Sequence, residues 1–211
     1  INGDGTVRVI YDGTSAHANG ESSEDRQIGT SAFNSSYNDN AYVGYMYGKI
    51  GASTYADAHA NTTDSTIKAY IDNWYKTNIV GTINEQYLVD NVFCNDRSIS
   101  SNKPSSSYNN LGYGTNATAY RWYYGPWSSG GYNSSMRLIC PQKNDAFTVS
   151  DTINGNGVLT YPVGLLSTDE IVLAGGWSAA NSVYYLYSGQ YWWASSPSVS
   201  YSLAGFGQFS I

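Results

Sequence analysis

The chain has 211 residues and a formal net charge of −6 at pH 7, and only 12% of it is charged, whereas a typical soluble domain is about a quarter charged. Its 10 Lys and Arg form no basic run, which argues against nucleic acid as a partner, and no stretch of about 18 apolar residues predicts a membrane span. The 21 Tyr and 6 Trp lie among Ser, Asn and Gly. That composition is typical of recognition surfaces and favours a binding protein over a catalyst.

The N-terminal part predicts two strands separated by a long loop. Residues 7–11 alternate between turn signals and predict a strand, whereas residues 14–40 are rich in Ser, Asn, Asp and Gly and predict a surface loop. Residues 42–48 predict a second strand with close backbone contacts at its glycines.

A helix is predicted next, from about Ser65 to Thr77, with Asp64 as its cap and Gly81 ending it. Five apolar or aromatic residues fall on one face of this helix: Ile67, Tyr70, Ile71, Trp74 and Tyr75. Such a stripe indicates packing against a sheet rather than a ligand site.

The middle of the chain predicts short extended segments. Residues 87–94 predict a strand or a buried turn, residues 137–141 an extended segment and residues 146–149 a short strand. Residues 99–118 predict a polar insertion.

A capping box gives the clearest local signal. Ser167 at the N-cap and Glu170 three residues later predict a helix to about Ala174, with Leu166 and Ile171 as a hydrophobic staple. The helix is expected to end at Gly175 and Gly176. Residues 191–211 then predict strands and loops, and with no repeat or linker the chain predicts a single α+β domain over 1–211.

Cys94 and Cys140 are the two cysteines of the sequence. The Lys-poor, Asn-, Ser- and Tyr-rich composition is typical of exported proteins, and in that setting the pair predicts one disulfide, with two buried free thiols as the alternative. Together with His17 and His59 they offer no spacing for a metal site, so we expect no metal and no cofactor. The loops at 38–40 and 95–96 do not match calcium-loop spacing.

The candidates for catalysis are weak. His17 and His59 are both expected in loops, and neither a nucleophile elbow nor a phosphate-binding glycine loop is present. A hydrolase using one of these histidines is the least favoured hypothesis, and no catalytic residue is assigned. Four sequons begin at Asn34, Asn61, Asn116 and Asn133, and they would carry sugars only in a eukaryotic secretory source.

Several segments together resemble an uncharacterised family of exported bacterial proteins that is common in gut Firmicutes. These segments are residues 1–15 (Ile-Asn-Gly-Asp-Gly through Asp-Gly-Thr-Ser), 93–98 (Phe-Cys-Asn-Asp-Arg-Ser), 161–176 and 184–197. The resemblance covers nearly the whole chain and implies a C-type-lectin-like fold, with two short helices, several short antiparallel strands and long loops. A further strand ending in an Arg-Pro pattern usually follows in that family. Its absence here, and the abrupt ends of the sequence, lead us to expect truncation at both ends.

The resemblance also implies a mode of action. Some lectin-fold proteins of this kind are variable proteins of diversity-generating retroelements, whose C-terminal segment is rewritten to display changing side chains on a fixed scaffold. Residues 193–211 would suit that role, and an ordinary set of core strands is the alternative. The Glu-Pro-Asn, Gln-Pro-Asp and Trp-Asn-Asp motifs of calcium-dependent lectins are absent. The late cysteine pair of formylglycine-generating enzymes is absent too, because both cysteines lie mid-chain.

These observations predict a secreted or cell-surface protein that binds a protein or glycan ligand, as an adhesin would. Aromatic residues supply contact area and serines supply adaptable hydrogen bonds in such a face. The expected ligand-binding residues are Tyr191, Trp192, Trp193, Ser195, Ser198, Ser200, Tyr201 and Phe206. The alternative is a pilin-like subunit of a surface appendage that self-assembles through its aromatic strings. Trp192→Ala and Trp193→Ala are expected to differ in effect, since one side chain should face the core and the other the ligand.

Overall fold

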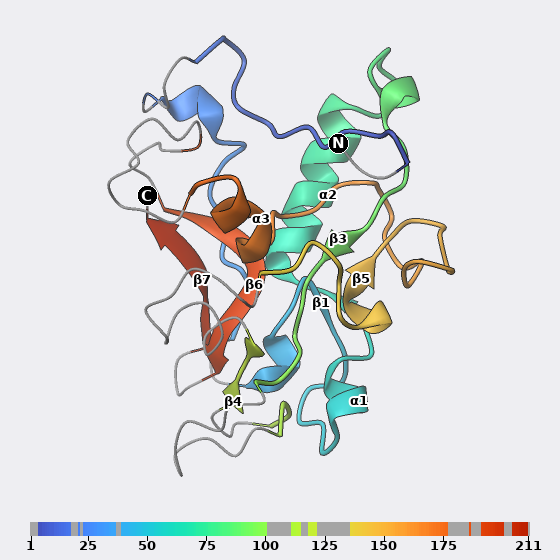
Figure 1. Cartoon of the computed structure of the whole chain (residues 1–211), viewed down its shortest axis with the longest axis vertical. Coiled ribbons are helices and arrows are strands. Elements are labelled where there is room, and N and C mark those ends of the chain that lie inside the picture. Colours follow the sequence, from blue (N-terminus) through green and yellow to red (C-terminus); the bar gives the residue numbers. More distant parts are fainter. Residues whose placement is uncertain are drawn as a thin grey trace.

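The computed structural model (Figure 1) describes residues 4–17, 21, 23–36, 39–100, 111–114, 118–121, 136–176, 186, 191–200 and 204–210. For 198–200 and 204–210 it describes the backbone alone. The three α-helices described are α1 (Tyr55–Ala58), α2 (Thr66–Asn78) and α3 (Thr168–Leu173). Single 3₁₀ turns span Glu24–Arg26, Asn40–Tyr42, Glu85–Tyr87 and Lys143–Asp145.

The strands form three small antiparallel sheets. β1 (Met46–Tyr47) pairs with β2 (Thr63–Asp64), and β3 (Phe93–Cys94) pairs with β5 (Ala146–Phe147). β4 (Thr118–Ala119), β6 (Tyr191–Ser200) and β7 (Ala204–Ser210) form the third sheet in the order β4-β6-β7. In Figure 1, β6 and β7 lie at the left and β3 and β5 at the right. The predicted α+β class is therefore confirmed, with three helices in place of two.

The two predicted helices form for the expected reasons, with one change of cap. The Oγ of Ser65, rather than the predicted Asp64, accepts a hydrogen bond from Lys68 N at 3.1 Å and caps α2, because Asp64 is held in β2 opposite Met46. The capping box of α3 is confirmed, since Ser167 N donates to Glu170 Oε2 at 2.9 Å and Glu170 N donates to Ser167 Oγ at 3.3 Å. Gly175, with φ of 95°, ends α3 as predicted.

The strand predicted over residues 7–11 is wrong. No described residue pairs with this segment in a ladder, and residues 7–11 are all exposed, with the side chain of Arg8 in an ion pair with Glu170 at 2.7 Å. Val7 and Val9 on either side of it remain exposed. The segment therefore has no buried face, and it is held by the ion pair of Arg8 rather than by strand pairing.

The core lies between α2 and the small sheets. Ile67 and Ile71 of α2 pack in one cluster with Phe33, Tyr45, Met46, Phe147 and Leu159. Trp193 of β6 packs against this cluster from outside, which ties the C-terminal hairpin to the core. None of the helices in the described part of the chain is long and apolar enough to cross a membrane.

The predicted disulfide is confirmed. Cys94 of β3 and Cys140 are bonded, with their Cα atoms 5.5 Å apart, inside the usual range for disulfides. The bond joins residues separated by 46 positions and fixes the otherwise irregular segment 136–141 to the β3–β5 sheet. Such a bond is compatible with an oxidising, extracellular environment.

Candidate functional site

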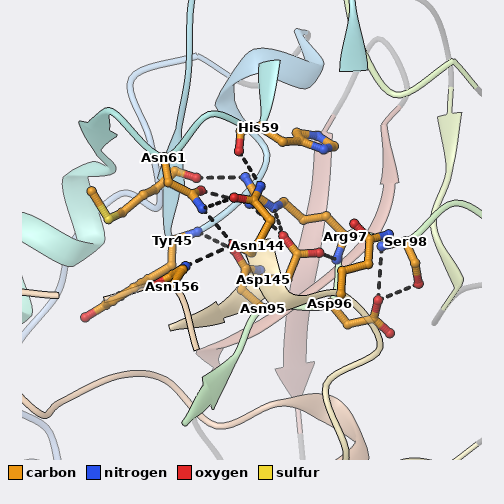
Figure 2. A network of polar contacts seen from close by, with 12 residues as sticks. Tyr45, His59, Asn61, Asn95, Asp96, Arg97, Ser98, Asn144, Asp145 and Asn156 are labelled. Carbon is orange, nitrogen blue, oxygen red and sulfur yellow. Dashed lines mark hydrogen bonds and ion pairs between the residues drawn. The ribbon is translucent and has the colours of Figure 1, made fainter. Parts of the chain in front are cut away.

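A network of polar side chains, most of them buried, surrounds Arg97 and Asp145 (Figure 2). Arg97 and Asp145 are both fully buried, and the guanidinium of Arg97 meets the carboxylate of Asp145 at 2.6 and 2.7 Å. The backbone N–H of Arg97 donates to the other carboxylate oxygen at 2.8 Å. Arg97 also donates to Met46 O at 2.9 Å and to Asn61 Oδ1 at 2.8 Å. The charge of each ion is therefore compensated by its partner and by further hydrogen bonds, as burial requires.

Two asparagines extend this network to neighbouring elements. Asn95 accepts a hydrogen bond from Tyr45 N at 2.6 Å and donates to Ser195 O of β6. Asn61 has a φ of 54°, in the left-handed region, and its Nδ2 donates to Asn144 O at 2.7 Å. A sugar cannot be attached at the Asn61 sequon while that side chain is buried in these bonds. Side chains of the network thus connect the segments around β1, β3, β5 and β6, which belong to three separate small sheets and are not joined by strand pairing.

His59, one of the two histidines considered for catalysis, is buried beside this network. It is the C-cap residue of α1, and its ring packs edge-on against Tyr55 with centroids 3.9 Å apart. Its backbone O accepts from Asn144, whereas the imidazole extends away from these contacts, as Figure 2 shows. Neither ring nitrogen has a hydrogen-bond partner in the structure as described. Burial, and secondarily the charge of Arg97, lower the pKa of His59 to about 2.

We expect His59 to make the fold sensitive to acid. Folded His59 stays neutral, whereas in the unfolded chain its pKa returns to about 6.5 and it takes up a proton below that pH. The stability is therefore complete above pH 6.5 and falls as the pH drops toward 2, by up to about 1.4 kcal/mol per pH unit. Urea unfolding compares the stability of His59→Phe with that of wild type at about pH 7.0, 5.5 and 4.5, which roughly span the range over which a free histidine titrates. The free energy of unfolding should fall less steeply with decreasing pH in the variant than in wild type. Parallel declines in the two proteins would contradict this assignment.

His17, the other candidate, closes a polar loop. Its Nε2 lies 2.8 Å from Asp25 Oδ1 and its Nδ1 lies 3.3 Å from Glu21 Oε1, and the hydrogen bond to Asp25 is the main cause that raises the pKa of His17. The hydroxyls of Ser15 and Ser23 both donate to Asp25 rather than facing the imidazole. These contacts tie residues 12–17 to Glu21 and Asp25, and among the described residues they do not place a nucleophile against a base.

A cleft of about 500 Å³ opens on the surface between the N-terminal segment, the disulfide and the start of α3. Arg121 lies on its floor between two carboxylates, with Asp169 Oδ2 at 2.6 Å from its Nη2 and Asp96 bound to its Nε. Asp169 also accepts from Arg137 N at 2.9 Å. Sequence reasoning missed this cleft, because its walls come from six separate stretches of the chain.

The structure places the predicted ligand-binding residues in three kinds of position. Tyr191 is 66% exposed at the open end of the β6–β7 hairpin, and Trp192 is half-buried. Trp193 and Ser195 instead face the scaffold: Trp193 Nε1 donates to Ser31 O at 2.9 Å, and the buried Ser195 Oγ donates to Cys94 O at 2.7 Å. Ser198 and Ser200 lie in β6 and Phe206 lies in β7, and for these three residues the structure describes the backbone alone. Tyr201 lies outside the described residues.

Trp193 should therefore matter for stability. Its ring packs edge-on against Phe33 with centroids 5.7 Å apart and contacts the core cluster. Trp193→Ala is expected to lower the free energy of unfolding by about 3 kcal/mol, because it leaves a cavity beside the core. Tyr191→Ala, two positions earlier on the same strand, should change it by less than about 0.5 kcal/mol. Chemical denaturation of both variants compares them, and equal losses would show that Trp193 is not part of the core.

Comparison of the chain with protein-family models, with curated proteins and with solved structures gives no match. The function of this chain therefore has to be argued from its own residues.

Proposed function

We propose that the chain is an extracellular ligand-binding protein that presents the ends of its β6–β7 hairpin on a rigid C-type-lectin-like scaffold. The observation that carries this proposal is the way β6 is anchored. Its middle is buried, with Ser195 N donating to Leu166 O at 2.8 Å and Ser196 Oγ accepting from Thr168 N at 2.9 Å. A hairpin held at its centre can carry varied residues at its ends without loss of the fold, because the ends contribute little to these bonds.

The anchoring narrows the binding face expected from the sequence. Trp193 and Ser195 serve the scaffold, so the proposed face consists of the remaining residues expected from the sequence: Tyr191, Trp192, Ser198, Ser200, Phe206 and Tyr201, the last of which lies outside the described residues. Tyr191 pairs with Ser210 across the open end of the hairpin and offers a large exposed aromatic surface there. Aromatic side chains of this kind bind protein surfaces and stack on sugar rings.

A binding screen with matched tyrosine variants tests the proposal. The folded chain is applied to glycan and bacterial-surface-protein arrays, and any ligand found is measured again with Tyr191→Ser and with Tyr87→Ser. Both tyrosines are exposed, at 66% and 74%, but Tyr87 lies in the 3₁₀ turn after α2, away from the hairpin in sequence. Tyr191→Ser should weaken binding about tenfold or more, as expected of an aromatic anchor, with Tyr87→Ser unchanged. Equal affinity of all three proteins would refute the hairpin as the binding face.

A further inference from the structure

The cleft beside the disulfide has an apolar rim formed by two adjacent exposed aliphatic side chains. Leu138 and Ile139 line the cleft and are 72% and 82% exposed. Exposed aliphatic groups gathered around one concave feature indicate an interaction surface, whereas single ones scattered over a surface need no explanation.

The lining inside that rim is strongly acidic. It contains six carboxylates, from Asp4, Asp90, Asp96, Asp151, Asp169 and Glu170, against the three guanidinium groups of Arg8, Arg121 and Arg137, which gives a net charge of −3. Most of these carboxylates already accept internal hydrogen bonds; Asp90, for example, accepts from Val149 N and Ser150 N, both at 2.7 Å. Such bonds hold the carboxylates in place but do not neutralise the negative net charge of the lining. A concave site concentrates the electric field of these charges on a cation that enters it.

The walls of the cleft are held in place before any partner arrives. Cys140, next to Ile139, is bonded to Cys94, and the backbone N–H of Arg137 donates to Asp169. On the opposite side, Arg8 is fixed by Glu170 and lies over the ring of Phe93 at 5.2 Å. Little conformational entropy is therefore lost on binding, which favours use of this surface for recognition.

From the apolar rim and the acidic lining, we propose that this cleft docks a polypeptide segment of a partner protein that carries a lysine or arginine flanked by apolar residues. The cation enters the cleft, and the flanking side chains cover Leu138 and Ile139. A small cation alone would leave the rim exposed, and an acidic segment would be repelled by the net charge. This surface is separate from the hairpin face, so the inference stands or falls independently of the proposed function.

Two capped peptides test the docking directly. One carries a central lysine between two leucines, with Gly and Ser at its ends, and the other carries glutamate in place of that lysine. Fluorescence polarisation with labelled peptides should show binding of the lysine peptide and binding at least about tenfold weaker for the glutamate peptide, since like charges in contact oppose association. Equal binding of both peptides, or binding of neither, would overturn the proposal.

A pair of double variants locates the binding on the chain. Leu138→Ser with Ile139→Ser removes exposed side chains at the cleft, and the double variant should lose about tenfold or more in affinity for the lysine peptide. Ile50→Ser with Ile83→Ser removes two aliphatic side chains of similar exposure, 56% and 71%, that do not line the cleft, and it should bind as wild type does. Unfolding curves check that all three proteins fold, which is expected because every substituted residue is exposed.

The same variants separate the proposed occupant from a second copy of the chain. Analytical ultracentrifugation of wild type should give a monomer whose mass does not change in the Leu138→Ser, Ile139→Ser variant. If wild type self-associates and this variant does not, the cleft is occupied by another copy and the proposal fails. Unchanged peptide affinity in that variant would equally overturn it.

Discussion

Replacing Arg97 with methionine is expected to lower the free energy of unfolding by about 3–5 kcal/mol, the usual cost of removing one partner from a buried ion pair. Asp145 would be left buried without its guanidinium, and Met46 O and Asn61 would lose a donor. Burial already raises the pKa of Asp145, and loss of Arg97 would raise it further. The loss in stability should therefore be largest near neutral pH and smaller in acid, where Asp145 takes up a proton. Urea denaturation at two pH values measures both effects.

An exposed arginine provides the matched control. The guanidinium of Arg137 has no ion-pair partner among the described residues, so Arg137→Met should change the stability by less than about 0.5 kcal/mol. The double variant Arg97→Met, Asp145→Leu should lose less than the two single variants together, because it removes both charges at once. A loss below about 1 kcal/mol for Arg97→Met would show that the network does not hold the fold together.

Removing the disulfide is the second large effect. Cys94→Ser with Cys140→Ser frees a loop of 46 residues in the unfolded chain and should cost about 4 kcal/mol by loop-closure entropy. For a chain of this length the melting temperature should fall by roughly 8–16 °C. The variant should keep its helices, since neither α2 nor α3 contains a cysteine.

Reducing agent separates the bond from the substitutions. Dithiothreitol should lower the melting temperature of wild type to near that of the serine variant and leave the variant unchanged. A wild-type protein that melts at the same temperature with and without reductant would contradict the role given to the disulfide.

The parts of the fold that sequence reasoning predicted are those decided by neighbouring residues. The capping box at Ser167 and Glu170 and the stripe through Ile67 and Ile71 each involve residues a few positions apart, so they are visible in the sequence alone. Composition and the number of cysteines were enough for the disulfide. The strand predicted over 7–11 is wrong because alternation indicates a strand only where one face is buried, and here every residue of the segment is exposed and Arg8 holds it through an ion pair.

The parts that were missed depend on contacts between distant residues. Arg97 and Asp145 are separated by 48 positions, and nothing near either residue in the sequence indicates its partner. The segment Asn95-Asp96-Arg97 was considered only as an oxygen-rich loop and as part of a resemblance, because a run of polar residues in a sequence is typical of an exposed loop. Likewise Ser195 was expected on a binding face because serine is polar, but its hydroxyl is used by Cys94 O inside the scaffold.

The C-terminal hairpin is proposed to have anchored positions in its middle and displayed positions at its ends, and sequencing the coding region across many isolates tests this division most directly. We expect substitutions to concentrate at positions 191 and 192 and from 198 to 206, whereas Asn95, Arg97, Asp145 and residues 193–197 stay constant. A near-copy of the variable region and a reverse transcriptase gene in the flanking DNA would identify retroelement diversification as the cause. Substitutions spread evenly over anchored and displayed positions would contradict the division, and with it the proposal that the hairpin ends form a binding face.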